Sequence, residues 1–262
     1  MFLEGSSAIL LGLVYVGILL SLHIGLDELA GALMVLSSFR WEMGGPFLLF
    51  IILWVIWERR WQVFMGGGML AFILLVVSFF LYSGWVIPFL RATWNSIQVG
   101  YGFSIHAILG KIWPDFGSTL GWVLTAVLVV LLGYEWAGAR GANFHRFVWA
   151  ICLTLAATPL VGFRVEMDQL VLLTMPVMLI IVVSRERWRK LGNGIAFLLL
   201  LFFFGAPWLI FSQGAPQWLG LLDGETLFLF WPLFAFIGLY WVRWWTIRPP
   251  RTWQDQAGQM RQ

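Results

Sequence analysis

Long apolar stretches recur along almost the whole chain, and they constrain its fold more than any other feature. A helix needs about 20 predominantly apolar residues to cross the hydrocarbon core of a bilayer. By that length we predict nine transmembrane helices, near residues 8–24, 28–40, 46–57, 63–83, 119–136, 147–163, 170–183, 191–212 and 224–244. The polar segments between them are short, so the expected fold is an all-α polytopic membrane protein without a soluble domain of any size.

The composition agrees with this class and excludes others. Of the 262 residues, 61% are hydrophobic and 11% are charged, against roughly 25% charged in a soluble domain. The basic residues lie in short clusters between apolar stretches, which is typical of topology signals and not of nucleic-acid binding. The single cysteine, Cys152, lies inside an apolar stretch, so no disulfide framework or cysteine metal site is possible within one chain.

Positive charge predicts the orientation, because cytoplasmic loops carry an excess of Lys and Arg. If each predicted helix crosses the membrane once and the C-terminus is cytoplasmic, most basic residues fall on the cytoplasmic side: Arg59, Arg60, Arg140, Arg146, Arg185, Arg187, Arg189, Lys190, Arg243, Arg248, Arg251 and Arg261. Only Arg40, Arg91, Lys111 and Arg164 fall outside. The N-terminus is therefore predicted to be outside, which hints at further helices upstream.

The predicted organisation is a single transmembrane helical domain over residues 1–245, followed by a polar cytoplasmic tail over residues 246–262 that we expect to be disordered. The second and third apolar stretches are short. Gly44-Gly45-Pro46 between them predicts a tight hairpin or a re-entrant pair.

The longest outer connector covers residues 84–118. Its apolar residues recur at helical spacing and predict an amphipathic helix on the outer surface; they are Val86, Ile87, Leu90, Trp94, Ile97 and Tyr101. One interpretation is a connector that rests on the membrane. The other is a lid over a site for a lipid-linked substrate, with Arg91 or Lys111 contacting phosphate.

A second polar segment on the outer side, Arg164-Val-Glu166-Met-Asp168, lies directly between two predicted helices. Ionisable groups so close to lipid are costly unless they face a cavity or each other. They form either a solvated turn with an internal ion pair or a set of substrate-binding groups that includes a general base. The pair Arg40 and Glu42, at the end of the second predicted helix, allows the same two interpretations.

The candidate site residues all map to the outer face, as expected of a protein that acts on a substrate in the outer leaflet: Arg40, Glu42, Arg91, His106, Lys111, Arg164, Glu166 and Asp168. No zinc motif, phosphate-binding loop or nucleophile triad occurs in the sequence, so no cofactor and no metal are predicted. Paired charges are missing from the centres of the predicted helices, which argues against an ion-coupled transporter.

From about residue 4 to 212 the chain resembles the downstream part of glycosyltransferase family 87, the polyprenyl-phosphate-mannose-dependent mannosyltransferases of the GT-C class. The stretches that carry the resemblance are Glu4-Gly-Ser-Ser7, Asp27-Glu-Leu-Ala-Gly-Ala-Leu-Met-Val-Leu-Ser-Ser38, Pro46-Phe-Leu-Leu-Phe50, Trp57-Glu-Arg-Arg-Trp61, Ser83-Gly-Trp85, Phe89-Leu-Arg-Ala92, Thr158-Pro159, Asp168-Gln-Leu-Val-Leu-Leu173 and Met175-Pro176. Two departures stand out: Arg40-Trp41-Glu42 replaces a Lys-Pro-Gln motif, and the Thr-Pro turn reaches its Asp over a longer gap.

The resemblance implies a GT-C-like helical bundle in a prokaryotic plasma membrane. The implied activity is transfer of a sugar from a polyprenyl-phosphate donor to a glycan or lipid acceptor at the outer face. The resemblance implies that this sugar is mannose. The family carries its catalytic carboxylate in an outer loop upstream of the matching region, so no carboxylate here takes that role. Glu166 and Asp168 would line the pocket. Two alternatives stay open: a non-catalytic membrane subunit or scaffold, and a lipid or small-molecule transporter.

Overall fold

A computed structural model describes residues 2–98, 105–161, 167–188, 191–206, 208–209 and 224–247. The described residues are almost all helical, and no strand occurs among them, which confirms the predicted all-α class. The elements are α1 (Phe2–Ile24), α2 (Asp27–Ser37), η1 (Ser38–Arg40), α3 (Trp41–Trp57), α4 (Trp61–Leu81), α5 (Val86–Gln98), α6 (Ile105–Ile112), α7 (Gly117–Gly138), α8 (Phe144–Val161), η2 (Met167–Leu173), α9 (Thr174–Arg187), α10 (Gly192–Leu200), η3 (Leu201–Gly205) and α12 (Gly224–Ile247).

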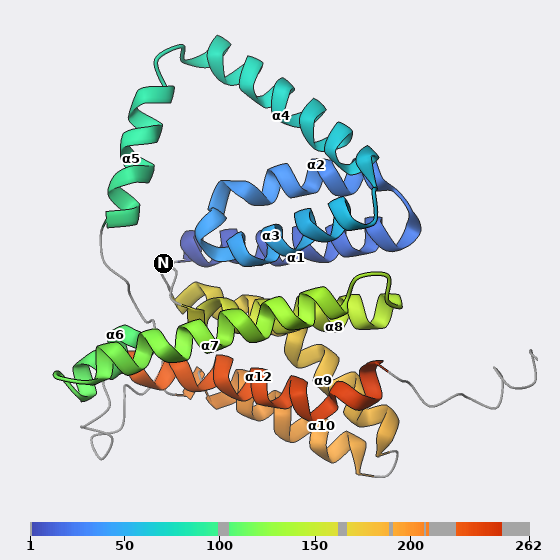
Figure 1. Ribbon diagram of the computed structural model, residues 1–262, viewed down its shortest axis with the longest axis vertical. Helices are drawn as coiled ribbons and strands as arrows, with labels where there is room; N and C mark the ends of the chain where they lie inside the picture. Colours follow the sequence, from blue (N-terminus) through green and yellow to red (C-terminus); the bar gives the residue numbers. More distant parts are fainter. Residues whose placement is uncertain are drawn as a thin grey trace, which may run out of the picture.

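Within the described residues, every apolar stretch predicted to cross the membrane is helical over most of its length. Helices α1, α2, α3, α7, α8 and α12 run broadly along one direction, side by side (Figure 1). By contrast, α5 lies across that direction at one end of the bundle (Figure 1). Within the predicted connector 84–118 the described residues include two short helices, α5 and α6, and residues 99–104 lie outside the described residues.

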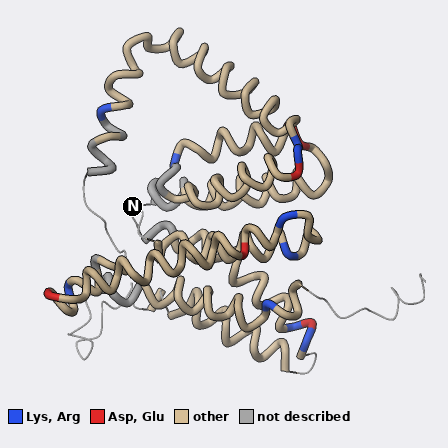
Figure 2. Tube along the Cα trace, in the orientation of Figure 1, with Lys and Arg blue, Asp and Glu red and all other residues tan. Residues whose placement is uncertain are grey.

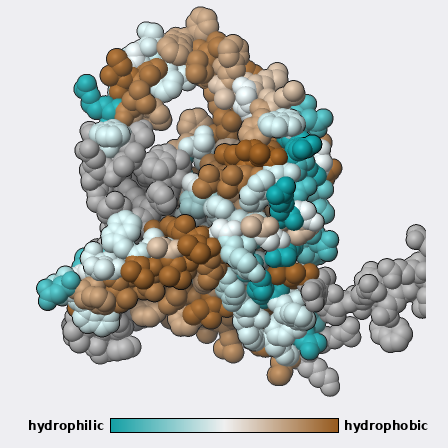
Figure 3. All heavy atoms as spheres, viewed as in Figure 1, coloured by the Kyte–Doolittle hydropathy of each residue, from teal (hydrophilic) through white to brown (hydrophobic). Residues whose placement is uncertain are grey.

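Three described helices are long and apolar enough to cross a membrane: α4 with 21 residues, α7 with 22 and α8 with 18. Most of the side chains of α4 and α7 are exposed, and many of these are large and apolar. In the space-filling view, apolar surface extends along the upper arm and across the lower body (Figure 3). Such continuous apolar surface is unfavourable in water and is expected in lipid.

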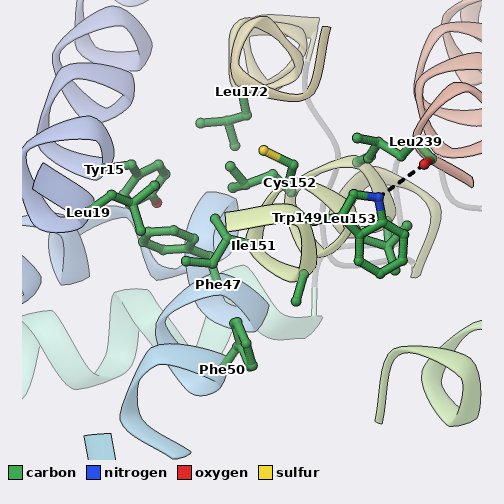
Figure 4. Close-up of a cluster of buried hydrophobic side chains, with 14 of the residues drawn as sticks. Tyr15, Leu19, Phe47, Phe50, Trp149, Ile151, Cys152, Leu153, Leu172 and Leu239 are labelled. Carbon is green, nitrogen blue, oxygen red and sulfur yellow. Dashed lines mark hydrogen bonds between the residues drawn. The ribbon is translucent and has the colours of Figure 1, made fainter. Parts of the chain in front are cut away.

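Helix α8 is the centre of the core. Its buried side chains run almost without interruption from Phe147 to Leu160. Figure 4 shows Ile151, Cys152 and Leu153 between residues of α1, α3, η2 and α12. The indole Nε1 of Trp149 donates a hydrogen bond of 3.0 Å to the carbonyl oxygen of Leu239, which ties α12 to α8. Because a buried indole N–H needs an acceptor, this bond also fixes the ring orientation.

Three connections meet at the end of the bundle opposite α5, which we call the arginine-rich end: the α1–α2 turn, the α3–α4 turn and the α7–α8 loop (Figure 1). Arg60 Nη1 donates to the carbonyl oxygen of Leu22 and forms an ion pair of 3.1 Å with Asp27. The backbone N–H of Gly141 donates to Glu58 Oε1 over 3.0 Å. The contacts of Arg60 join the α1–α2 turn to the α3–α4 turn, and the Gly141 hydrogen bond joins the N-terminal half to the α7–α8 loop.

The turn between the second and third apolar stretches differs from the prediction. Gly44-Gly45-Pro46 does not form the hairpin, because these residues lie within α3, and the chain reverses at η1 instead. A Cβ atom at Gly44 would collide with the hydroxyl of Tyr15, so glycine lets α1 and α3 approach closely. Pro46 removes one backbone hydrogen bond near the start of α3 without ending the helix.

The last described helix extends two residues into the segment 246–262 that the sequence predicts as a tail. Helix α12 continues to Ile247, so residues 246 and 247 belong to the bundle. Residues 248–262 lie outside the described residues.

Candidate functional site

An apolar groove of about 410 Å³ lies between α1, α8, η2 and α9. Its lining is almost entirely aliphatic, with two flexible methionine side chains: Ile9, Gly12, Leu13, Tyr15, Val16, Leu155, Val171, Leu172, Thr174, Met175 and Met178. Ile9, Leu13 and Met178 are exposed at its mouth. The groove is thus open to the surroundings of the bundle, and its chemistry suits a hydrocarbon chain.

Local sequence explains why the groove stays open. Gly12 has no side chain, and a Cβ atom there would only just touch Val171, at 4.0 Å. Tyr15 forms part of the floor and is held in place by the ring of Phe47, with ring centroids 4.3 Å apart. Met175 and Met178 add unbranched side chains that adapt to an irregular ligand surface.

The groove is close in sequence to the predicted polar segment 164–168. Its lining residues from Val171 to Met178 follow that segment directly, in η2 and the first turn of α9. Asp168 belongs to η2, but its side chain is not among those described. Arg164 and Glu166 lie outside the described residues. Their expected role therefore stays a prediction.

The other predicted site residues lie at the α5 end of the bundle, which carries few charges (Figure 2). Arg40 ends η1 and is partly buried, while Glu42 begins α3 and its side chain is not described. Arg91 on α5 and Lys111 on α6 are both exposed. The backbones of these four residues lie at one end of the molecule, on four different elements.

His106 has a different environment from the other predicted site residues. Its side chain is buried, and its ring stacks on Trp122 of α7 with centroids 4.5 Å apart. A Cβ atom at Gly121 would collide with the Cα atom of His106, so α6 and α7 are in close contact here. Burial lowers the pKa of His106 below its ordinary value of 6.5. This geometry makes His106 a packing residue between α6 and α7.

Sequence reasoning missed one buried charged group, Glu135. It pairs with Arg243 of α12, with Nη2 and Oε1 2.9 Å apart, and its side chain is 4% exposed. The guanidinium of Arg243 also lies 5.4 Å from the centre of the Trp149 ring. A carboxylate near the end of an apolar stretch was the available signal, because such a charge needs a partner.

In the described part of the chain, no three His, Cys, Asp or Glu side chains gather as they would around a metal ion.

Comparisons with known proteins identify no family for this chain. No protein-family model, no curated protein and no solved structure matches the chain. The functional argument therefore rests on the residues and the groove described above.

Proposed function

We propose that the protein is a membrane glycosyltransferase-like protein of the GT-C class that binds a polyprenyl-phosphate sugar from the outer leaflet. The observation that carries the proposal is the apolar groove, whose lining continues directly from the polar segment 164–168. A polyprenyl-phosphate sugar is also part apolar and part polar, because it joins a long isoprenoid chain to a charged head. The chain would occupy the groove, and its phosphate would meet the outer cations.

The proposal includes nine membrane crossings, with the N-terminus outside and the C-terminus in the cytoplasm of a prokaryotic cell. Two observations support it. The connections at the arginine-rich end hold basic residues that the sequence assigns to the cytoplasm, including Arg59, Arg60, Arg140 and Arg146. The opposite end holds few charges, so the difference has the sign of the positive-inside rule.

The proposed reaction is a sugar transfer. An acceptor hydroxyl attacks the anomeric carbon, a glycosidic bond forms, and the bond between that carbon and the phosphate oxygen breaks. A carboxylate takes the hydroxyl proton as general base. Arg or Lys stabilises the charge on the leaving polyprenyl phosphate. The cations available on the proposed outer side are Arg40, Arg91, Lys111 and Arg164. We assign no residue as the base.

The direct test is photocrosslinking in proteoliposomes with a polyprenyl phosphate that carries a diazirine in its isoprenoid chain. Crosslinks are expected on α1 and α9, at Leu13, Met175 or Met178. The phosphate-free polyprenol is the matched probe. It should label the same positions more weakly, because it lacks the group that the outer cations recognise.

Two results would contradict the proposal. Crosslinks spread over all lipid-facing helices would mean that the groove has no preference for the chain. Equal labelling by the polyprenol would mean that the protein does not recognise the phosphate. Sugar transfer from a labelled donor in the same vesicles separates an enzyme from a protein that only binds the lipid.

A non-catalytic membrane subunit is the second candidate, and the exposure of α4 favours it. Phe72, Phe80 and Leu81 are all exposed, and this helix extends away from the bundle (Figure 1). A partner helix could cover this surface in place of lipid. Native mass measurement in a mild detergent, on protein from its own membrane, would show a bound subunit if this candidate is right.

A further inference from the structure

The corner between α4 and α5 sets the direction of helix α5. The corner is an aromatic cluster in which Trp85 packs edge-on against Phe79 and against Phe89, with ring centroids 6.2 Å and 5.6 Å away. The backbone N–H of Phe89 donates to the carbonyl oxygen of Trp85 over 3.0 Å, which continues the helix out of the corner. As a result α5 lies across the direction of α1, α3 and α7 (Figure 1).

The described side chains of α5 divide into two faces. Residues turn by about 100° each along a helix, so Val86, Leu90 and Trp94 lie within about 80° of one another, with Ile87 beside them. Ile87 is 68% exposed, Leu90 60% and Trp94 64%. Three large apolar side chains on one face, all exposed, form a strip that no part of the described chain covers.

One edge of this strip carries a cation, and the other carries Phe89, which is 56% exposed. Arg91 is exposed and lies about 60° beyond Trp94 around the helix. Pro88 is also exposed and lies nearly opposite Leu90. An apolar strip bordered by a cation and by tryptophan is the pattern of a helix at the boundary between acyl chains and headgroups.

The position of α5 fits the same boundary. Helix α4 is long and apolar enough to cross a membrane and ends at Leu81, directly before the corner. The chain therefore reaches the surface of the hydrocarbon where α5 begins. A helix that then runs across the bundle direction lies in the plane of the membrane.

We infer that α5 is an in-plane membrane helix whose strip of Ile87, Leu90 and Trp94 inserts among the acyl chains of the outer leaflet. Arg91 contacts the lipid phosphates from the border of the strip, its aliphatic stem following the apolar surface. This inference does not depend on the sugar-transfer reaction, because it needs only the bilayer as partner; the assignment to the outer leaflet rests on the proposed topology.

Single-cysteine spin labelling of the full chain in phospholipid vesicles tests the inference. Labels are placed at L90C and W94C on the strip, with I87C as an alternative strip position, and at P88C on the opposite face. The native Cys152 is 1% exposed inside α8 and should take up little label; C152A provides a second background. Collision rates are measured with oxygen, which is soluble in lipid, and with a water-soluble nickel chelate.

Labels at positions 90 and 94 should collide several-fold more with oxygen than with the nickel chelate, and the label at position 88 should show the reverse. Strip labels that collide mainly with nickel would overturn the inference, since α5 would then lie in water. Shielding from both reagents would also overturn it, because protein would cover the strip. Spin–spin broadening in that case would identify a second copy of the chain.

Discussion

Arg243 of α12 and Glu135 of α7 form an ion pair 108 residues apart in sequence, with Nη2 2.9 Å from Oε1 and 3.1 Å from Oε2. The carboxylate is almost fully buried, at 4% exposed, while the arginine side chain is 36% exposed. Most of the desolvation cost of the pair therefore falls on the carboxylate, because it is the more deeply buried partner.

Replacing Arg243 should therefore destabilise the protein more than replacing Glu135. Arg243→Gln leaves a buried carboxylate without its cation, which we expect to lower the free energy of unfolding by about 2 kcal/mol, below the full cost for a wholly buried pair because Arg243 is partly exposed. Glu135→Gln removes the buried charge itself and should have a smaller effect. Thermal unfolding in detergent measures both.

The double variant with Gln at both positions provides the control for this pair. It should be more stable than Arg243→Gln alone, because no unpaired buried charge remains. Strictly additive effects in the double-mutant cycle would show that the two residues do not interact in the membrane protein.

Two glycines of α4 should respond in opposite directions to the same substitution. A Cβ atom at Gly66 would collide with the backbone carbonyl oxygen of Glu28 in α2, so Gly66→Ala must push the helices apart. Overpacking of this kind destabilises by about 1–3 kcal/mol. Gly68 has nothing within 4 Å of such an atom. Gly68→Ala should stabilise by about 0.5–1 kcal/mol through helix propensity.

The comparison needs only the unfolding midpoints of the two alanine variants under identical conditions. Equal effects would mean that α2 and α4 are not packed as closely as the glycine contacts indicate.

The length of the apolar stretches was sufficient to predict the described helices, because a helix that crosses a bilayer needs about 20 apolar residues. Helical spacing of apolar residues predicted α5, where these residues occupy one face of the helix instead of filling the whole stretch. It could not predict the pairing of Glu135 with Arg243, because distant helices have no sequence signal for which of them are neighbours. The burial of His106 was equally hidden, since it depends on the close approach that Gly121 permits.

The candidate site was predictable only in part. Charge placed Arg40, Arg91 and Lys111 at one end of the bundle, but the apolar groove had no signal of its own. Its walls come from α1, α8, η2 and α9, and each lining residue reads as an ordinary apolar position in sequence. Only the packing of these four elements creates a concave surface.

His106 should make the protein less stable as the pH falls. Burial lowers the pKa of its side chain below 6.5, so near pH 6 the unfolded chain binds a proton that the folded chain does not. Stability is therefore complete above the unfolded pKa and decreases as the pH falls from there through the folded pKa. Unfolding midpoints measured at about pH 7.5 and about pH 5.5 should differ in this direction.

His106→Phe is the matched control for this pH effect, because it keeps an aromatic ring on Trp122 but cannot be protonated. The variant should lose the part of the pH dependence that comes from His106. An unchanged pH dependence in His106→Phe would show that this side chain is accessible to water and titrates alike in both states.

Filling the groove should weaken the binding of a polyprenyl phosphate without unfolding the protein. Leu13 is 63% exposed at the mouth of the groove, so Leu13→Trp projects a large ring over the space that the isoprenoid chain would occupy. Loss of one or two buried CH₂ groups, at about 0.8 kcal/mol each, corresponds to a decrease in affinity of about tenfold. Val130→Trp is the control, because Val130 is 73% exposed on α7 and does not line the groove. Crosslinking yield of the diazirine probe, titrated in proteoliposomes, measures both variants; an equal decrease in the two would place the lipid outside the groove and leave its walls as simple packing defects between α1 and α9.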